Sequence, residues 1–495
     1  MLLSLVLATS GCRKDEQFTD DPGATLELSV DTVLFDTIFT TLGSVTKRFT
    51  IRNRNTNAVR VDILLEGGSP SPFRINVDGS SGLVFNGVEI LGEDSAYVFV
   101  EATLDANNTN NPLLIEDRIL FTTNGNEQEV KLLAWGQDAL FYPNPDAPLQ
   151  SVQGFPAFSY IAGGFDSMGN QICGQNVVWT AEKPIVLLNY GVVDSCNTLT
   201  IEPGARIYVH GGAGLWVYRG GRITAVGTVT ERIVFQGDRL EPEYQDLPGQ
   251  WDRIWVNEGP AENRFENVEI RNALIGLQPQ YWPLAGTIGT STNQLVLNNV
   301  RIQNCSAAGI LSENYRIEST NLLVANCGQY CVALTGGGQY TFRHSTIANY
   351  WNFDIRNEPA FAMTNAFVDV NGSTQVREIA TSLFVNSNFV GNNTNEFQLV
   401  IDGSQPADFI FDHCHFRTDQ ATDDLAHFPD QSSIYRNLSA VFVGPSDFDL
   451  HLAASDQSAI DKGIVLADPP EVLFDLDGVF RGIGNPDLGC YEFEP

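Results

Sequence analysis

A short block of apolar and asparagine positions returns along the middle of the chain at a nearly constant interval. The block Asn299-Val-Arg-Ile-Gln-Asn304 returns at 321–326 and 344–349, and an earlier copy lies at 267–272. From Asn304 onward the copies are 22 to 23 residues apart. This period, with three short apolar strands in each copy, predicts the coils of a three-sided parallel β-helix, which stack at about 4.8 Å.

Stacked coils place equivalent side chains above one another, so the repeat predicts ladders. Amides in a ladder can bond to one another and to the turn backbone. One ladder contains Asn272, Asn304, Asn326 and Asn349. A second, five residues earlier, contains Asn267, Asn299, Asn321 and His344, and the register carries His413 to the same line. The inward positions in this register are largely apolar, namely Phe265, Leu297, Ser319, Phe342, Ile310, Val332 and Ile355.

The remaining patterns divide the chain into further parts. From 24 to 137, apolar residues alternate in runs separated by turn clusters, which predicts an immunoglobulin-like β-sandwich. Prolines at 143, 145 and 148 mark a linker at 138–165. The β-helix is then expected at 166–445, with an inserted loop from Leu277 to Thr292, and a capping module at 446–495.

Two further stretches carry a resemblance to a known family. The upstream stretch Leu199-Thr-Ile-Glu-Pro-Gly204 and the tail motif Ser458-Ala-Ile-Asp-Lys-Gly463 resemble surface-anchored bacterial proteins of the right-handed parallel β-helix repeat family. The resemblance implies a pectin lyase-like stack of coils. The expected fold class is therefore all-β, an N-terminal immunoglobulin-like β-sandwich followed by a right-handed parallel β-helix (solenoid) with a C-terminal cap.

The first residues suggest where the protein is located in the cell. An apolar start followed by small residues is typical of a secretory signal, and Thr9-Ser-Gly-Cys12 resembles a bacterial lipobox with Cys12 as the lipidated residue. Lys14-Asp-Glu16 resembles the surface-export signal of Bacteroidota lipoproteins. Residues 1–23 are then signal and tether. The resemblance implies an outer-membrane, lipid-anchored protein facing the exterior, which meets the membrane only through its lipid.

Charge narrows the partners. The chain has 28 basic and 60 acidic residues, a formal net charge of −32, which excludes nucleic acid as a partner. Asp475-Leu-Asp477-Gly resembles the start of a calcium-binding loop, although the later acid of such a loop is missing. The alternative is pairing of Asp477 or Asp487 with Arg481. We expect no cofactor other than Ca²⁺.

The cysteines leave two interpretations open. Cys305 and Cys327 each follow a ladder asparagine and are 22 residues apart, so they should stack on adjacent coils. There they form either a disulfide or a pair of free thiols in the core. Cys173 and Cys196 are placed to close a loop near the start of the helix.

Catalytic signals are weak. No lysine lies between Lys183 and Lys462, although β-helix polysaccharide lyases commonly use a lysine or arginine base. No acid pair has the arrangement that glycosidases need. The remaining candidate is Asp412 with His413 or with an outward-pointing His415, and the alternative is turn capping beside a solvated histidine.

Two aromatic pairs indicate ligand binding more clearly than these residues indicate catalysis. Tyr281 and Trp282 lie in the inserted loop, and Tyr350 and Trp351 follow Asn349. Their rings could stack on sugars, or could instead cover the core. We therefore expect a cell-surface lipoprotein that binds polysaccharide or another surface ligand without catalysis. The alternatives are a polysaccharide lyase or glycoside hydrolase with an atypical site, and a structural adhesin.

Overall fold

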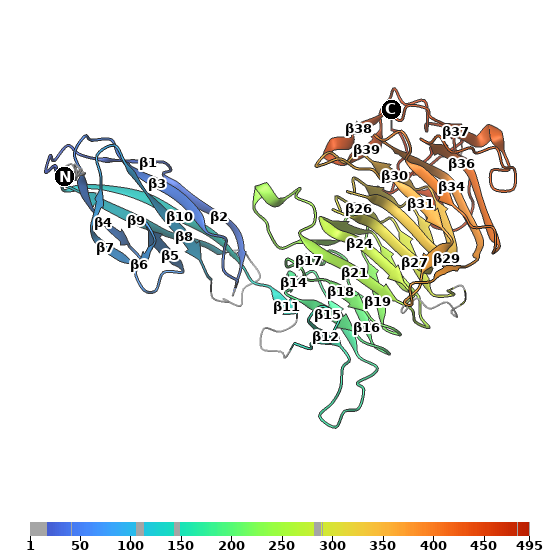
Figure 1. Cartoon of the computed structure of the whole chain (residues 1–495), viewed down its shortest axis with the longest axis horizontal. Helices are drawn as coiled ribbons and strands as arrows, with labels where there is room; N and C mark the ends of the chain where they lie inside the picture. The colour runs from blue at the N-terminus through green and yellow to red at the C-terminus, as the bar shows by residue number, and fades with distance from the viewer. Residues whose placement is uncertain are drawn as a thin grey trace, which may run out of the picture. The chain divides into compact units, whose positions relative to one another are not determined.

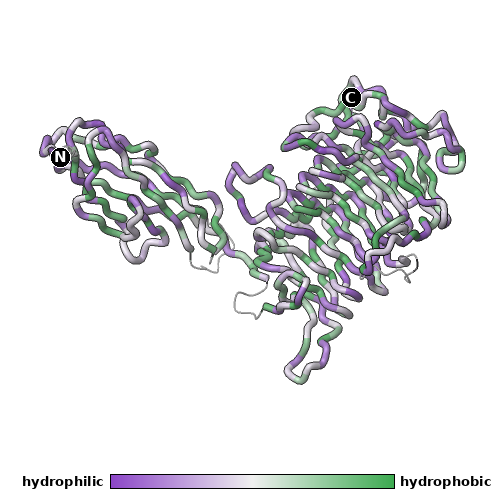
Figure 2. The backbone as a smooth tube through the Cα atoms, viewed as in Figure 1, coloured by the Kyte–Doolittle hydropathy of each residue, from purple (hydrophilic) through white to green (hydrophobic). Residues whose placement is uncertain are grey.

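The computed structural model divides into two compact units between Ala139 and Leu140 (Figure 1). It describes residues 17–40, 42–104, 113–142, 149–281, 289, 291–482 and 484–494. Almost all of the regular structure is β, and hydrophobic and hydrophilic residues alternate along many strands (Figure 2). This alternation puts one side of each strand into a core.

The first unit is the predicted sandwich. β4 illustrates it, since every second side chain from Val59 to Leu65 is buried. One sheet has the order β1 (Leu26–Leu28), β3 (Lys47–Asn53), β8 (Ser95–Ala102), β5 (Phe73–Val77), β6 (Ser80–Gly82). The other has the order β2 (Thr32–Phe39), β10 (Asn126–Gln137), β9 (Leu113–Thr123), β4 (Val59–Leu65), β7 (Val84–Ile90).

Part of the expected tether belongs to this sandwich. Phe18 forms a parallel bridge with Ala58, and the Asn124 amide donates to the carbonyl of Thr19 at 2.8 Å. Residues 17–23, which we expected in the tether, therefore belong to the sandwich, because backbone bonds of Gln17 and Thr19 with Ala58 hold this stretch against the sheet. Residues 1–16, including Cys12, lie outside the described residues.

The second unit is a parallel β-helix with three faces, and each strand pairs with its equivalent one coil later. The first face contains β12 (Phe158–Ala162), β15 (Tyr190–Val193), β18 (Leu215–Val217), β21 (Trp251–Asn257), β24 (Ala273–Gln280), the starts of β27 (Ala308–Thr320) and β29 (Tyr330–Arg343), β31 (Phe361–Thr364) and β35 (Phe397–Val400).

The second face contains β13 (Asn176–Trp179), β16 (Thr198–Ile201), β19 (Arg222–Val226), β22 (Asn263–Glu266), β25 (Gln294–Asn298), the ends of β27 and β29, and the starts of β34 (Ile379–Gly391) and β36 (Ala407–Phe416).

The third face contains β11 (Leu140–Tyr142), β14 (Ile185–Leu187), β17 (Arg206–Val209), β20 (Ile233–Gly237), β23 (Val268–Arg271), β26 (Arg301–Gln303), β28 (Leu323–Ala325), β30 (Thr346–Asn349), the ends of β34 and β36, and β37 (Ile434–Arg436).

Two expected boundaries shift. β11 and β12 lie inside the expected linker 138–165, so the helix begins at Leu140. Proline-rich sequence between these two short strands hid them. The loop expected from Leu277 begins later, because β24 continues through Gln280. A short antiparallel hairpin, β32 (Ala366–Val368) with β33 (Thr374–Val376), also extends from the later coils.

Large apolar side chains fill the coils. Toward the C-terminal end the core is a stack of phenylalanines, and Phe428 packs on Phe411 with centroids 5.4 Å apart, covering the last coil. Most predicted inward positions are buried, but Ile355 is 88% exposed. Its expected place is taken by Phe361, which pairs with Val332, because the chain loops out after Asn349.

The ladders explain the turns. Asn272, Asn304 and Asn326 have φ near +60°, a conformation that asparagine adopts more readily than other residues with side chains. Asn304 donates to Asn272 at 2.8 Å, whereas Asn326 donates to the carbonyl of Pro445. Asn349 remains in a strand and bonds the backbone of Cys327.

The second ladder is longer than predicted. Asn321 donates to Asn299 at 2.9 Å, and Asn299 donates to Asn267 at 3.3 Å. Asn386 continues this line between His344 and His413, and it bonds the ring of His344 at 3.1 Å. All of these positions have positive φ.

The C-terminal segment lies along the third face. Leu323, Ala325, Ala348 and Val390 point outward from the coils and are buried beneath Phe442, Leu450, Leu452, Ala459, Leu476, Leu488, Cys490 and Tyr491. The segment includes β38 (Phe442–Gly444), β39 (Asp449–Leu452) and the 3-10 turns η3 (Pro445–Asp447) and η4 (Pro470–Leu473). Two earlier 3-10 turns are η1 (Pro242–Tyr244) and η2 (Gln431–Ser433). The module thus covers the side of the helix.

The second ladder anchors this segment, so its loss should destabilise the helix. The Asn321 amide donates to the carbonyls of Glu471 and Phe474, and its oxygen accepts from Arg481. Asn321→Gly keeps the backbone conformation accessible but leaves these buried groups unpaired, and we expect a loss of about 1–3 kcal/mol in unfolding free energy. Urea unfolding followed by tryptophan fluorescence measures this loss. Trp135 is the only tryptophan before Leu140, so the other tryptophans report on the β-helix.

Asp461→Gly is the matched control, because Asp461 also has positive φ but is exposed. It should change the unfolding free energy by less than about 0.5 kcal/mol. Equal losses in the two variants would contradict a role for the ladder amides in holding the C-terminal segment.

Candidate functional site

The first face carries an outward stack of aromatic rings. The triplets Leu215-Trp-Val217 and Ile254-Trp-Val256 pair with each other. The first and third residue of each triplet point into the core, so the middle residues, Trp216 and Trp255, point away from it. Their rings stack 4.7 Å apart at 11°. The ring of Phe155 packs on that of Trp216, with centroids 5.4 Å apart at 14°, so it adds a third ring to the stack.

A mostly apolar cavity of about 310 Å³ opens beside this stack. Trp216, Tyr218 and Tyr160 form part of its wall, and Phe165 is 62% exposed at its rim. The polar lining residues are Gln171, Asp194 and Ser195. A cavity with aromatic walls and few convergent polar groups is the usual form of a small-ligand site.

A disulfide between Cys173 and Cys196 fixes the segment that forms this rim. The Asp166 carboxylate accepts from the backbone amides of Met168 and Asn170 at 2.8 Å each, so local hydrogen bonds also order this segment around residues 166–170. The sequence had left this pairing open, and the structure makes it part of the cavity's support.

A row of amides and carboxylates continues from the aromatic stack. The Trp255 indole donates to Gln280 at 2.8 Å, and the Gln280 amide donates to Glu313 at 2.7 Å. The Trp216 indole donates to Asn257 at 2.6 Å. Asn257, Gln280 and Glu313 occupy paired positions in successive coils, so these groups form a line along the helix.

Charged groups flank this line. Arg253 contacts Asp252 at 2.9 Å and donates to Gln278. Burial raises the pKa of Glu313, and the Gln280 hydrogen bond and the charge of Arg253 oppose that rise. Burial also raises the pKa of Tyr190, whose hydroxyl bonds Asp252.

Of the predicted ligand-binding aromatics, Tyr281 lies at this face. It follows Gln280 directly, and its amide donates to the carbonyl of Glu313 at 3.1 Å. Trp282 lies outside the described residues. The structure therefore places one expected aromatic beside the amide row.

The other aromatic pair lies elsewhere and is largely covered. Trp351 is 6% exposed, and its indole donates to Asp354 at 2.5 Å. Tyr350 packs against Phe442 of the C-terminal segment. Trp351 does line a cavity of about 420 Å³ above the first ladder, together with Phe353, Asp246, Glu269, Asn304 and Asp447.

Of the two candidate catalytic pairs, the structure brings Asp412 together with His413. The Asp412 carboxylate contacts the ring of its neighbour His413 at 2.7 Å and accepts from Ser433 at 3.1 Å. His415 points away from the helix core, but it is buried and contacts the carbonyl of Leu438 at 3.2 Å. His415 thus points outward as predicted, but the C-terminal segment covers the third face and buries its ring.

The two aspartates of the calcium candidate contact other groups of the chain. Asp475 accepts from the amides of Asp477, Val479 and Glu492, and Asp477 pairs with Arg301 and His451. Arg481 pairs with Glu492 instead of either predicted aspartate. Within the described ranges, no group of three or more histidine, cysteine, aspartate or glutamate side chains is placed to hold a metal ion.

Cys305 and Cys327 are free, fully buried thiols, so the structure selects the second of the two interpretations. Close packing by Gly276 and Gly309 leaves their sulfurs inside the core. They are thus part of the helix packing and contact the inner side of the first face.

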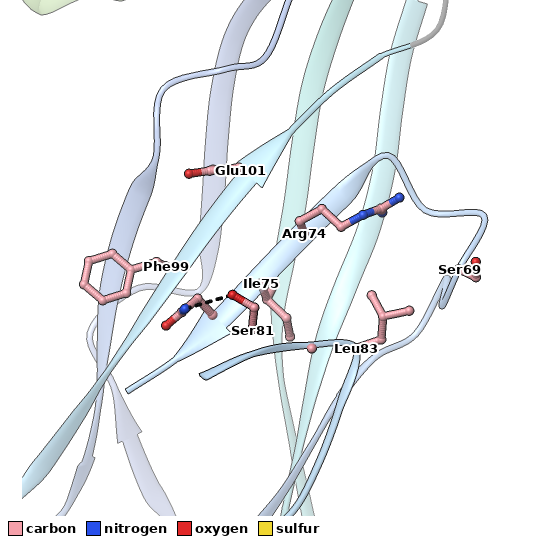
Figure 3. A pocket seen from close by; sticks show the side chains of 9 residues that line it. Ser69, Arg74, Ile75, Ser81, Leu83, Phe99 and Glu101 are labelled. Atoms are coloured by element: carbon pink, nitrogen blue, oxygen red, sulfur yellow. Dashed lines mark hydrogen bonds between the residues drawn. The ribbon is translucent and has the colours of Figure 1, made fainter. Parts of the chain in front are cut away.

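The sandwich has its own hollow of about 440 Å³ (Figure 3). Arg74, Phe99 and Glu101 lie around it, and Asn76 donates to Ser81 at 3.0 Å. The Arg74 guanidinium donates to the carbonyl of Phe73 at 2.7 Å, so it serves its own strand. This hollow lacks the stacked rings found on the helix.

Sequence reasoning missed Trp216 and Trp255. Their signal was present, because an outward position flanked by core residues holds tryptophan in two paired strands. Among the described residues, no helix is long and apolar enough to cross a membrane.

Comparisons with known proteins do not assign a family. No protein-family model and no curated protein matches the chain. Solved structures give partial matches: a family 123 glycoside hydrolase from Clostridium perfringens (11% identity, 22% of this chain and 23% of that chain, TM-score 0.16) and the PapD-like domain 7 of human CEP192 (13% identity, 28% and 96%, TM-score 0.17). The E. coli chaperone DraB is similar to the same limited degree (16% identity, 22% and 54%, TM-score 0.17).

Proposed function

We propose that the chain is a surface lipoprotein whose first helix face binds a polysaccharide without cleaving it. The observation that carries the proposal is the half-buried ring of Trp255, which stacks on the buried Trp216 beside the row Asn257, Gln280 and Glu313. Ring faces accept the apolar C–H surface of sugars, and amides bond their hydroxyls. The lipid anchor at Cys12 and the outer-membrane location rest on the sequence motifs and form part of the same proposal.

The geometry of a helix suits a polymer. The strands of the first face stack at about 4.8 Å per coil, and its outward positions run from Tyr160 near the start to Gln398 near the end. A long chain could therefore meet equivalent positions on several coils. A small ligand would use only the cavity beside Trp216.

Trp255→Ala should weaken polysaccharide binding at least tenfold, or about 1.4 kcal/mol, since it removes a stacking surface and the indole donor to Gln280. Affinity electrophoresis of purified protein against soluble polysaccharides finds a ligand, and calorimetry measures it. Trp255→Phe keeps a ring and should retain most of the affinity.

Trp135→Ala is the matched control, because Trp135 is 42% exposed on the sandwich and should leave affinity unchanged. Unchanged binding in Trp255→Ala, with unfolding as in the parent, would overturn the assignment to this face. Release of reducing ends or unsaturated products from the bound polymer would replace the non-catalytic proposal with the hydrolase or lyase alternative.

A further inference from the structure

We infer that the polymer bound at the first face is an uncharged sugar chain and not a uronate polymer. The inference rests on the proposed function and concerns the chemical class of its ligand. It follows from how the positive charges of this face are used.

The arginines at this face already serve carboxylates. On β12, β15, β18, β21 and β24, Arg253 is the only positively charged residue. It contacts Asp252 at 2.9 Å and bonds Gln278. Arg219, in the turn after β18, forms an ion pair with Glu258. Recognition of a uronate carboxylate calls for a guanidinium that can bind it in two-point geometry, and each of these guanidiniums already contacts a carboxylate of the chain.

The carboxylates of the face add repulsion. Asp194 and Asp252 lie near the aromatic stack, and Glu258 and Glu313 lie along the amide row. These four acids face two arginines, so the local charge is negative even with Glu313 protonated. A polymer with a carboxylate on each unit would bring like charges together in a partly buried site, which is unfavourable.

The remaining groups suit hydroxyls and C–H surfaces. Phe155, Tyr160 and Tyr218 present rings around the cavity, and its uncharged polar lining groups are Gln171 and Ser195. Neutral hydrogen bonds and ring stacking depend little on ionic strength, whereas ion pairing at a surface is screened by salt. The two ligand classes therefore predict different salt dependence.

The experiment compares two polymer sets with the full chain. The neutral set is mixed-linkage glucan, galactomannan and arabinoxylan, and the uronic set is polygalacturonate, alginate and hyaluronan. We expect binding to at least one neutral polymer, at least tenfold weaker binding to every uronic polymer, and a change in the neutral affinity below about twofold between about 50 and about 500 mM NaCl.

The outcomes separate the two proposals. Tighter binding to a uronic polymer, lost at high salt and weakened in Trp255→Ala, would overturn the inference and leave polysaccharide binding standing. For such a polymer, reduction of its carboxyls to alcohols would then abolish binding, whereas the inference expects reduction to strengthen it. Absence of binding to both sets would overturn the proposed function itself.

Discussion

Glu396→Ala should lower the free energy of unfolding of the helix by about 3–5 kcal/mol, because it leaves a buried guanidinium without its partner. The side chain of Arg356 is 2% exposed and that of Glu396 is 0% exposed. They form two N–H···O bonds of 2.8 and 2.5 Å. Glu396 also accepts from the amides of Ala360 and Asn393, so its loss frees one buried and one partly buried donor as well.

This pair holds the loop after β30 onto the next coil. Arg356 donates to the carbonyl of Asn349 at 3.1 Å, at the end of that strand. Glu89→Ala is the control, since Glu89 forms an exposed ion pair with Arg60 and should change stability by less than about 1 kcal/mol. The double variant Arg356→Met, Glu396→Leu should recover much of the loss. A loss below about 1 kcal/mol for Glu396→Ala would refute the argument.

Acid should destabilise the helix through two buried histidines. Burial lowers the pKa of His415 to about 4, and burial with the nearby charge of Arg481 lowers the pKa of His344 well below its usual value. Both rings therefore fold in the neutral state. Because the pKa is lower in the folded chain, this stability is complete above about pH 6.5 and is lost as the pH falls toward 4.

The expected loss from His415 alone is roughly 3 kcal/mol, since each unit of pKa difference corresponds to about 1.4 kcal/mol. Urea unfolding at a series of pH values between about 7.5 and about 4.5 measures it. In His415→Gln the amide can replace the ring in the contact with the carbonyl of Leu438, and the stability should fall less with acid.

His451 supplies the opposite sign. It lies between Asp449 and Asp477, whose hydrogen bonds raise its pKa. Its contribution is therefore present below pH 6.5 and is lost as the pH rises. His451→Gln should make the acid loss steeper, and identical profiles for both histidine variants would contradict the assignment.

The ladders could be predicted because their signal is local. A turn that requires positive φ favours asparagine, so the turn residue and its spacing appear together in the sequence. Asn386 escaped prediction because it lies 42 residues after His344, in a coil lengthened by the β32–β33 hairpin. A fixed interval cannot find a member of the stack that follows such an insertion.

The candidate face was harder to predict, because its members come from separate coils. Trp216 and Asn257 are 41 residues apart, and Gln280 and Glu313 are 33 apart. The covering of the third face was also invisible, because Leu323 and Ala325 appear in the sequence as ordinary strand residues.

The covering of the third face has a consequence for synthesis. Arg232 bonds the carbonyl of Leu476, 244 residues later, and Arg301 pairs with Asp477. Coils can assemble as they emerge from the ribosome, because each pairs with its predecessor. The apolar strip formed by Leu323, Ala325, Ala348 and Val390 then stays uncovered until the segment from Phe442 onward is synthesised. The nascent protein therefore passes through an intermediate with exposed apolar surface, which is prone to aggregation and can bind chaperones.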